Sequence, residues 1–248
     1  MKAIYNDQSF QQGIKKLASL MEDSTNTVIL TGAGMDTQSD IPDFRSKDGW
    51  WKKMDPSVVA SAATMKQNYP LFQDFYITRI KMLQNVKPHP GHLILAELER
   101  EGLIQSIATQ NVSSLHQLAG SKKVYELHGN IREIKCGACN TEAKLQDFLD
   151  KKSCHTCGEN LLRPNVVLFG ERLPQKVWHL AEQDIRQSDL LIVIGTSLKV
   201  SPVNQLPLLA SGKIVLINNE DVVAPAQFDL KIIGPAQETL EELSSSLA

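Results

Sequence analysis

The sequence lacks the features that mark fibrous, membrane-spanning or strongly charged proteins. Aromatic residues make up only 6% of its 248 residues, there are four cysteines, and 26 Lys and Arg nearly balance 28 Asp and Glu. The longest uninterrupted apolar run, residues 190–194, is far shorter than the roughly 18 residues needed to cross a bilayer. A charge so close to neutral gives no electrostatic basis for binding nucleic acid or an anionic membrane. We therefore expect neither as a partner.

Targeting segments and repeats are also missing. The first ten residues are too polar for the apolar part of a signal peptide, so we expect a cytoplasmic protein. A chain of this length buries about 70% of its surface without disulfide bonds and forms one large domain, with room for a small insertion. No exposed apolar stripe stands out as an interface, so a monomer is the default expectation.

Short apolar runs alternate with helical patterns along the chain. The strand-like runs are residues 27–30, 104–108, 166–169, 190–194 and 214–217, and the helix-like stretches are residues 93–101 and 175–186. Nearly continuous Val- and Ile-rich runs are typical of central parallel strands that are covered on both faces. The alternation predicts an α/β fold with a doubly wound, Rossmann-like parallel sheet. Residues 36–88 and 132–163 do not follow the alternation, which indicates a long connection with short helices and a small inserted module.

All four cysteines lie in the second of these segments, as two C-x-x-C pairs. They are Cys136, Cys139, Cys154 and Cys157. In a reducing compartment this spacing favours four thiolates around a structural zinc ion. A pair of redox dithiols and a remnant without metal are the alternatives. Four sulfurs complete the zinc coordination, so His155 is interpreted as a solvated turn residue.

Three strand ends carry residues suited to a nucleotide. Gly32-Ala33-Gly34 follows the first strand, although Thr37 stands where a dinucleotide-binding turn has its third glycine. The loop after it contains Asp43, Phe44 and Arg45, and an Arg there can pair with phosphate. Gly195-Thr196-Ser197 and Asn218-Asn219-Glu220 follow two later strands. Each alone fits an ordinary turn, but together they predict a nucleotide at one sheet edge.

With these motifs, the sequence resembles the bacterial-type sirtuins, the NAD-dependent protein-lysine deacylases. The matches keep the family's order: Gly32-Ala33-Gly34, residues 42–46, Thr109-Gln110-Asn111, Leu115-His116, Leu127-His128-Gly129, both cysteine pairs, residues 163–171, residues 195–198 and Ile217-Asn218. The resemblance implies a large NAD-binding domain (1–35, 90–131 and 164–248). It also implies a small domain made of a helical cofactor-loop part (36–89) and the zinc module (132–163).

The resemblance also implies a reaction and roles for residues. The nicotinamide–ribose bond of NAD breaks with oxocarbenium character and releases nicotinamide, and the acyl oxygen of a modified lysine attacks the ribose. After water enters, free lysine and O-acyl-ADP-ribose result. His128 would be the general base, and Asn111 would help to position water. Without the resemblance, His128, His116, His89 and His92 are equally open to structural roles, with His89 and His92 expected to cap the following helix. The implied NAD-binding residues are Gly32, Ala33, Gly34, Thr37, Asp43, Phe44, Arg45, Gln110, Asn111, Val112, Ser113, Gly195, Thr196, Ser197, Asn218, Asn219 and Ala236.

The resemblance also implies two segments for substrate recognition. Val167, Leu168, Phe169 and Gly170 would pair with the substrate backbone as an added strand. Tyr76 and Arg79 share a helix face, since they lie three residues apart, and in one sirtuin branch such a pair reads the distal carboxylate of succinyl- or malonyl-lysine. A core tyrosine beside a surface arginine is the equally open alternative.

Three positions depart from the family pattern. Ser113 replaces an aspartate that contacts the nicotinamide carboxamide, Asp36 stands where serine is usual, and Asp40 where glycine is usual. A hydroxyl at position 113 brings no charge to favour the developing oxocarbenium, and Asp36 is expected to cap the following helix. Three functions are therefore weighed: a working deacylase, an NAD glycohydrolase or ADP-ribosyltransferase, and an NAD-binding homologue without turnover. The deacylase is preferred because His128, Asn111 and Arg45 are retained.

Overall fold

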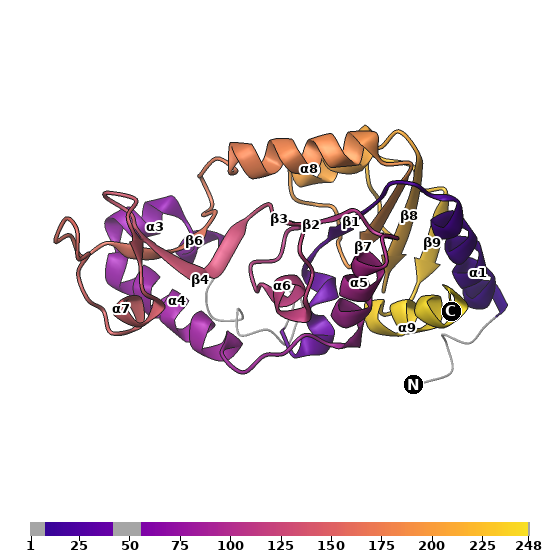
Figure 1. The fold of residues 1–248 in the computed structure, drawn as a ribbon. Helices are drawn as coiled ribbons and strands as arrows, with labels where there is room; N and C mark the ends of the chain where they lie inside the picture. Colours follow the sequence, from indigo (N-terminus) through magenta and orange to yellow (C-terminus); the bar gives the residue numbers. More distant parts are fainter. Residues whose placement is uncertain (1–7, 42–55, 248) are drawn as a thin grey trace.

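The large sheet is fully parallel. The structure is a computed structural model and describes residues 8–41 and 56–247. In that part of the chain six strands pair in the order β3-β2-β1-β7-β8-β9 (Figure 1). They are β1 (Thr27–Thr31), β2 (Ser106–Thr109), β3 (Val124–Glu126), β7 (Leu190–Ile194), β8 (Lys213–Asn218) and β9 (Leu230–Ile233). The predicted doubly wound α/β fold is confirmed.

Helices cover both faces of this sheet. Along β7, Ile192 and Ile194 belong to a core shared with three helices on one face, whereas Leu191 and Val193 belong to a core on the other face. The helices are α1 (Gln8–Asp23), α5 (Pro90–Arg100) and α9 (Ala236–Leu247) on the first face, and α8 (Gln175–Gln187) with the 3-10 helix η4 (Val203–Leu209) on the second (Figure 1). Side chains that alternate between two apolar cores explain why the central strands read as unbroken hydrophobic runs.

A second, antiparallel sheet of order β5-β4-β6 lies at the other end of the molecule (Figure 1). Its strands are β4 (Gly129–Cys136), β5 (Glu142–Ala143) and β6 (Leu162–Val166), and the helices around it are α2 (Pro56–Val59), α3 (Ala62–Gln67), α4 (Tyr69–Leu83) and α7 (Leu145–Leu149). A separate core built around Phe72, Phe75 and Phe148 holds them together. The prediction that residues 166–169 form a central parallel strand is wrong: β6 ends at Val166, and the next residues are a loop. Four apolar residues do not distinguish these two settings.

The other predicted elements fall close to the observed ones. Helix α5 starts at Pro90 rather than residue 93, because His89 occupies the N-cap position and its side chain accepts from the Gly91 N–H. The sequence analysis missed α1, α9, β3 and β9, and also the short helices η4 and α6 (Leu115–Ala119). Strand β3 has three residues and β9 four, too short for a periodic signal.

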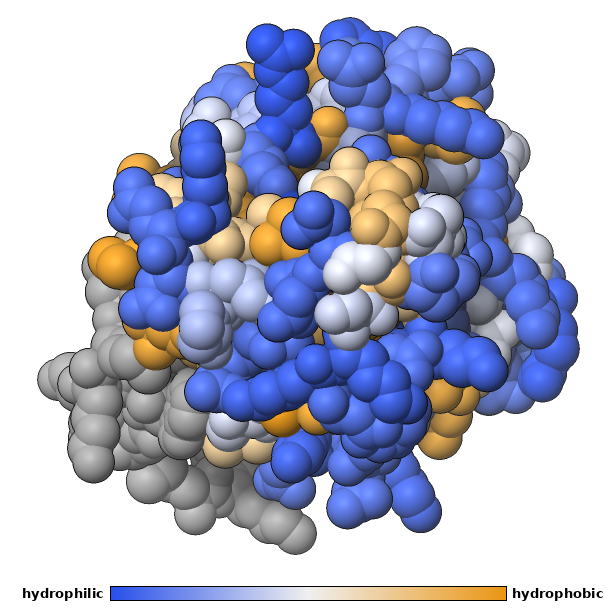
Figure 2. All heavy atoms as spheres, turned by 90° about the vertical axis from the view of Figure 1, so that its left-hand side faces the viewer, coloured by the Kyte–Doolittle hydropathy of each residue, from blue (hydrophilic) through white to orange (hydrophobic). Residues whose placement is uncertain are grey.

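The surface of the small-sheet end is mostly hydrophilic, with small apolar patches between hydrophilic side chains (Figure 2). Among the described residues, no helix combines the length and hydrophobicity that a membrane span requires.

Candidate active site at the switch point of the sheet

The turns after β1 and β7 meet where the strand order reverses. Strand β1 pairs with β2 on one side and with β7 on the other, and the sheet grows outward from there in both directions. In open α/β sheets, ligands bind beyond the carboxyl ends of the strands at this point. The Gly34 N–H donates to the Gly195 carbonyl at 2.7 Å, and a Cβ added to Gly34 would lie 2.8 Å from the Gly195 Cα. Glycine is therefore required for the two turns to approach.

Gln110 and Asn111 tie the end of β2 to the same two turns. The Gln110 side-chain amide donates to Thr196 Oγ1 at 3.0 Å, and the Asn111 side-chain amide donates to the Gly32 carbonyl at 2.9 Å. The ends of β1, β2 and β7 thus converge. Two of the three polar strand ends that the sequence predicted, those after β1 and β7, are among them; the third, after β8, follows the strand next to β7. The convergence places small residues, amide donors and hydroxyls at one site, a set of groups suited to a dinucleotide.

The other predicted NAD-binding residues lie around this convergence, with three exceptions. Ala33 and Thr37 are half-buried in η1 (Ala33–Met35) and η2 (Thr37–Ser39), and Thr37 Oγ1 donates to the Gly34 carbonyl. Asn218 ends β8, where its amide donates to the Glu220 carbonyl, and Asn219 is exposed beside it. Val112 and Ser197 follow β2 and β7, and Ala236 is buried at the start of α9. Asp43, Phe44 and Arg45 lie outside the described residues.

His128 lies between β3 and β4, beside Gln110. Its Nδ1 is 3.0 Å from the Gln110 carbonyl oxygen. A carbonyl only accepts, so Nδ1 carries the proton and Nε2 keeps its lone pair. Burial lowers the pKa of His128, and the hydrogen bond to Gln110 only partly opposes this. The imidazole is therefore neutral near pH 7, the form that a general base needs.

Asp36 is buried rather than capping a helix. Its side chain makes no cap hydrogen bond to η2; Oδ2 instead accepts from Ser113 Oγ at 2.7 Å, and Oδ1 lies 3.2 Å from His92 Nε2. The expected capping role of Asp36 is wrong, because the side chain turns toward the loop after β2. Position 113 carries no charge itself, but a carboxylate lies within hydrogen-bond distance of it. Asp40 adopts φ +62° and is exposed, as expected for a residue that tolerates left-handed geometry.

Three histidines pack beneath the glycine turn. The ring centroids of His89 and His92 are 4.3 Å apart, and those of His92 and His116 are 5.0 Å apart. His89 caps α5, as predicted; the same role expected for His92 is wrong, since its Nε2 faces Asp36. His116 lies at the start of α6 (Leu115–Ala119) with Nε2 3.0 Å from Thr31 Oγ1. Sequence reasoning missed this cluster because His116 lies on a different helix from His89 and His92, and no spacing in the sequence links it to them.

Buried His116 should make the protein acid-sensitive. Burial, reinforced by His92, lowers the pKa of His116 to about 3. The unfolded histidine has a pKa of about 6.5, so below that pH the unfolded chain binds a proton that the folded chain does not. We expect His116 to contribute about 2 kcal/mol to the loss of unfolding free energy between pH 7.5 and pH 5. Urea unfolding of wild-type protein and of His116→Gln at both pH values measures this contribution. Equal pH dependence in the two proteins would contradict it.

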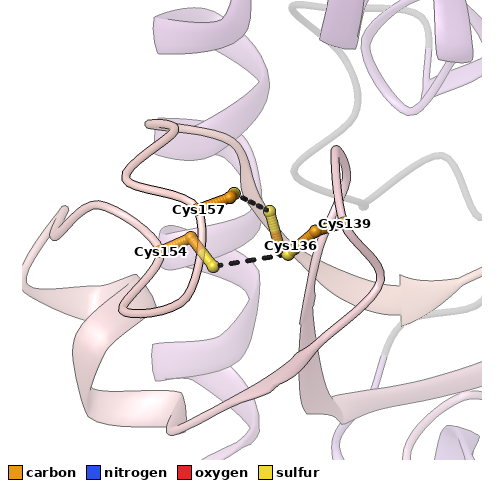
Figure 3. Close-up of side chains that lie close together, drawn as sticks. All are labelled: Cys136, Cys139, Cys154 and Cys157. Atoms are coloured by element: carbon orange, nitrogen blue, oxygen red, sulfur yellow. Dashed lines mark hydrogen bonds between the residues drawn. The ribbon is translucent and has the colours of Figure 1, made fainter.

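The four cysteines form one tetrad. Their sulfur atoms all lie within 4.8 Å of one another, with Cys136 to Cys157 at 3.6 Å and Cys139 to Cys154 at 3.7 Å (Figure 3). Four thiolates around zinc at 2.3 Å lie about 3.8 Å apart, so the spacing fits a structural zinc ion. His155 is exposed and outside the tetrad, as predicted.

The two cysteine pairs share one backbone design. The Asn140 N–H donates to the Cys136 carbonyl, and the Gly158 N–H donates to the Cys154 carbonyl. Asn140 and Gly158 both have positive φ, which glycine and asparagine adopt at least cost. The two turns are therefore formed by the chain itself, with their thiols converging on one point.

Comparison with known proteins decides the family. The sequence profile of the Sir2 family matches residues 32–202. The chain belongs to the Sir2 family. It is 44% identical to an NAD-dependent protein deacetylase of Oceanobacillus iheyensis, over 86% of this chain and 91% of that protein. It is also 44% identical to NAD-dependent protein deacetylase 1 of Geobacillus kaustophilus, over 94% of this chain and 98% of that protein.

Solved Sir2 structures share the fold. A structure of Sir2 with a p53 peptide and NAD+ superimposes with a TM-score of 0.85 at 35% identity, covering 94% of this chain and 97% of that one. A Sir2 structure with a deacetylated p53 peptide and 3′-O-acetyl-ADP-ribose gives a TM-score of 0.87 at 36% identity, covering 94% and 97%. The predicted family and fold class are confirmed.

In this Sir2 protein, an ion pair between Arg163 and Glu171 fixes the loop after β6. Arg163 is buried and donates to both carboxylate oxygens of Glu171, and to the Val166 carbonyl at 2.6 Å. Glu171 in turn accepts from the Leu168 N–H at 2.9 Å. Burial raises the pKa of Glu171, but the hydrogen bonds from Arg163 and Leu168 outweigh it and lower the pKa. The pair holds the loop in a fixed conformation, a role that sequence reasoning missed.

The loop after β6 contacts the His128 backbone on one side and residues 60–62, at the start of α3, on the other. The Val167 N–H donates to the His128 carbonyl at 2.8 Å, and Phe169 exchanges backbone hydrogen bonds with Ala60 and Ala62. Phe169 and Gly170 are exposed, Val167 is half-buried and Leu168 is buried. The four residues predicted to bind substrate therefore form one segment directly beside His128.

Tyr76 and Arg79 lie on α4, and Tyr76 is close enough to the Arg163–Glu171 ion pair for both charges to act on its phenol. Tyr76 is 2% exposed, and its ring packs against Phe72 and Phe75 at centroid distances of 4.8 and 5.0 Å. Burial raises the pKa of Tyr76 to about 12, opposed by the positive charge of Arg79. The pair shares one face of the helix, with the phenol belonging to the small-sheet core.

Proposed function

We propose that this Sir2 protein is an NAD-dependent protein-lysine deacylase that produces nicotinamide, free lysine and O-acyl-ADP-ribose. The observation that carries the proposal is His128, neutral with its Nε2 lone pair available, beside Gln110 and Asn111 at the switch point. The deacetylase names of the relatives and the peptide and NAD+ complexes of the neighbours support it. The site uses peptide, not nucleic acid or membrane, and we assign it to a monomer in the cytoplasm, where free thiols persist.

Separate groups of residues bind NAD, accept the proton and bind the peptide. NAD supplies the nicotinamide–ribose bond that is broken. The turns at Gly32–Gly34 and Gly195–Ser197 bind its phosphates and adenosine side, and Gln110 and Asn111 hold the ribose. His128 Nε2 accepts a ribose hydroxyl proton, while Nδ1 remains fixed on the Gln110 carbonyl. The segment Val167–Gly170 binds the peptide backbone, which makes recognition tolerant of sequence.

The products distinguish this proposal from its alternatives. With NAD and an acetyl-lysine peptide, mass spectrometry should find equal amounts of deacetylated peptide, nicotinamide and O-acetyl-ADP-ribose. A glycohydrolase would give plain ADP-ribose and leave the peptide acetylated, and an ADP-ribosyltransferase would add ADP-ribose to a protein. Either result would overturn the proposal.

The acyl preference has its own test. We propose that Arg79, with Tyr76, binds the distal carboxylate of succinyl-lysine; the deacylase names of two archaeal relatives are compatible with acyl groups beyond acetyl. Arg79→Met should lower the ratio of kcat/KM for succinyl over acetyl peptide by about 10-fold or more, since a hydrogen bond to a charged group contributes about 1.5–3 kcal/mol. Lys81→Met, exposed on the same helix, is the control and should leave the ratio unchanged. An unchanged ratio for Arg79→Met would refute the assignment.

A further inference from the structure

Asp36 joins three separate parts of the chain. It lies between η1 and η2, directly after the glycine turn, and is 4% exposed. Its carboxylate accepts from Ser113, in the loop after β2, at 2.7 Å, and from His92, on α5, at 3.2 Å. Burying a carboxylate is costly unless hydrogen bonds replace those it made with water. The hydrogen bonds from Ser113 and His92 therefore stabilise Asp36 in its buried position.

Ser113 is committed to the same contact. Its hydroxyl donates to Asp36 and accepts the Leu115 N–H at the start of α6, and its carbonyl accepts from Arg132 Nε at 3.0 Å. The side chain is 4% exposed. The hydroxyl at position 113 is thus held by the acid at position 36, which brings a carboxylate to within 2.7 Å of that hydroxyl, while Arg132 contacts the Ser113 backbone carbonyl.

We propose that Asp36 and Ser113 are an exchanged acid–hydroxyl pair, in which Asp36 supplies the negative charge on the nicotinamide side of the site and positions Ser113. The sirtuin pattern has the serine and the aspartate at the opposite positions, and the 2.7 Å contact shows that here the two side chains touch. An exchange across that contact keeps one carboxylate and one hydroxyl in almost the same space. The inference rests on the proposed function, because the charge acts on the oxocarbenium that forms when nicotinamide leaves.

A purely structural role for Asp36 makes a different prediction. A buried acid that only holds His92 and Ser113 in place should be replaceable by asparagine, which keeps the shape and an acceptor oxygen. A charge that stabilises the transition state is lost in Asp36→Asn. That variant should bind NAD about as tightly as the wild type while kcat falls by about 10²-fold, the usual cost of removing one transition-state contact.

Four proteins test the exchange directly: wild type, Asp36→Ser, Ser113→Asp and the double variant. Ser113→Asp places two carboxylates at hydrogen-bond distance in a buried site, where both cannot ionise, so its NAD affinity and melting temperature should fall. Asp36→Ser leaves two hydroxyls and no charge, so kcat should fall. The double variant restores one of each and should return to within about 5-fold of wild type in kcat/KM, a strongly non-additive result. Glu101→Gln, an exposed carboxylate at the opposite end of α5 from His92, is the control and should leave every readout unchanged.

The readouts are NAD dissociation constant by calorimetry, melting temperature without ligand, and kcat with KM. A double variant as impaired as the sum of its single variants, or Asp36→Asn with wild-type kcat, would overturn the proposal. A wild-type protein that binds NAD without peptide-dependent turnover would instead overturn the proposed function. The coupling between positions 36 and 113 would still be measured by affinity and melting temperature in that case.

Discussion

Replacing His128 with alanine is expected to lower peptide-dependent turnover by about 10²–10⁴-fold, the range typical of a lost general base. The imidazole is fixed by its Nδ1–H on the Gln110 carbonyl and kept neutral by burial. The hydrogen bonds that join Gly34, Gly195, Gln110 and Thr196 do not involve its side chain, so the NAD site should persist. The measurement is kcat for deacylated peptide, together with NAD affinity by calorimetry.

His155→Ala is the matched control for this prediction, because His155 is exposed and makes no part of the strand-end convergence. It should keep wild-type turnover. If His128→Ala retained more than about a tenth of the wild-type kcat, general-base catalysis by His128 would be wrong.

Removing one cysteine of the tetrad is expected to have the second large effect. Cys154→Ser leaves three thiolates, and because structural zinc sites contribute directly to folding, the small sheet should unfold locally. The tetrad joins the β4–β5 turn to the loop before β6, and β6 leads into the segment beside His128. Zinc content should fall from about one ion per chain to nearly none, and turnover should be lost with it.

Two measurements separate this effect from general misfolding. The zinc content is determined by elemental analysis, and hydrogen exchange compares the small sheet with β1 and β7. Protection of β1 and β7 should survive in Cys154→Ser, since their cores contain no cysteine. Wild-type protein that folds and turns over with no zinc would contradict the structural role of the tetrad.

The fold could be predicted to the extent that its signals are local. The run at residues 190–194 coincides with β7, because strands buried on both faces leave unbroken apolar sequence. The cysteine tetrad could be predicted equally well, since the C-x-x-C spacing typical of metal ligands is a local feature of the sequence. Residues 166–169 were wrongly predicted to form a central strand. The chain leaves β6 at Val166 and continues as a loop that is as apolar as a strand would be.

The candidate site was only partly predictable, because most of its contacts join residues that are far apart in the sequence. Gly32 and Gly195 follow separate strands, and the rule that parallel strand ends share an edge brought them together, whereas Gln110 was placed there only by the family resemblance. The contact of Asp36 with Ser113 and His92 joins residues 77 and 56 positions apart, and no periodicity encodes it. Read as single departures, Asp36 and Ser113 each indicated weakened catalysis; the structure shows that they form one hydrogen-bonded pair.

The most direct test is the release of nicotinamide from NAD, followed by chromatography in three parallel reactions: without peptide, with acetyl-lysine peptide and with succinyl-lysine peptide. The deacylase function predicts release only when a peptide is present, and the better peptide identifies the preferred acyl group. Equal release with and without peptide would contradict it and assign the site to NAD hydrolysis. No release in any reaction, from zinc-loaded protein that binds NAD, would contradict it in the other direction and leave an NAD-binding protein without turnover.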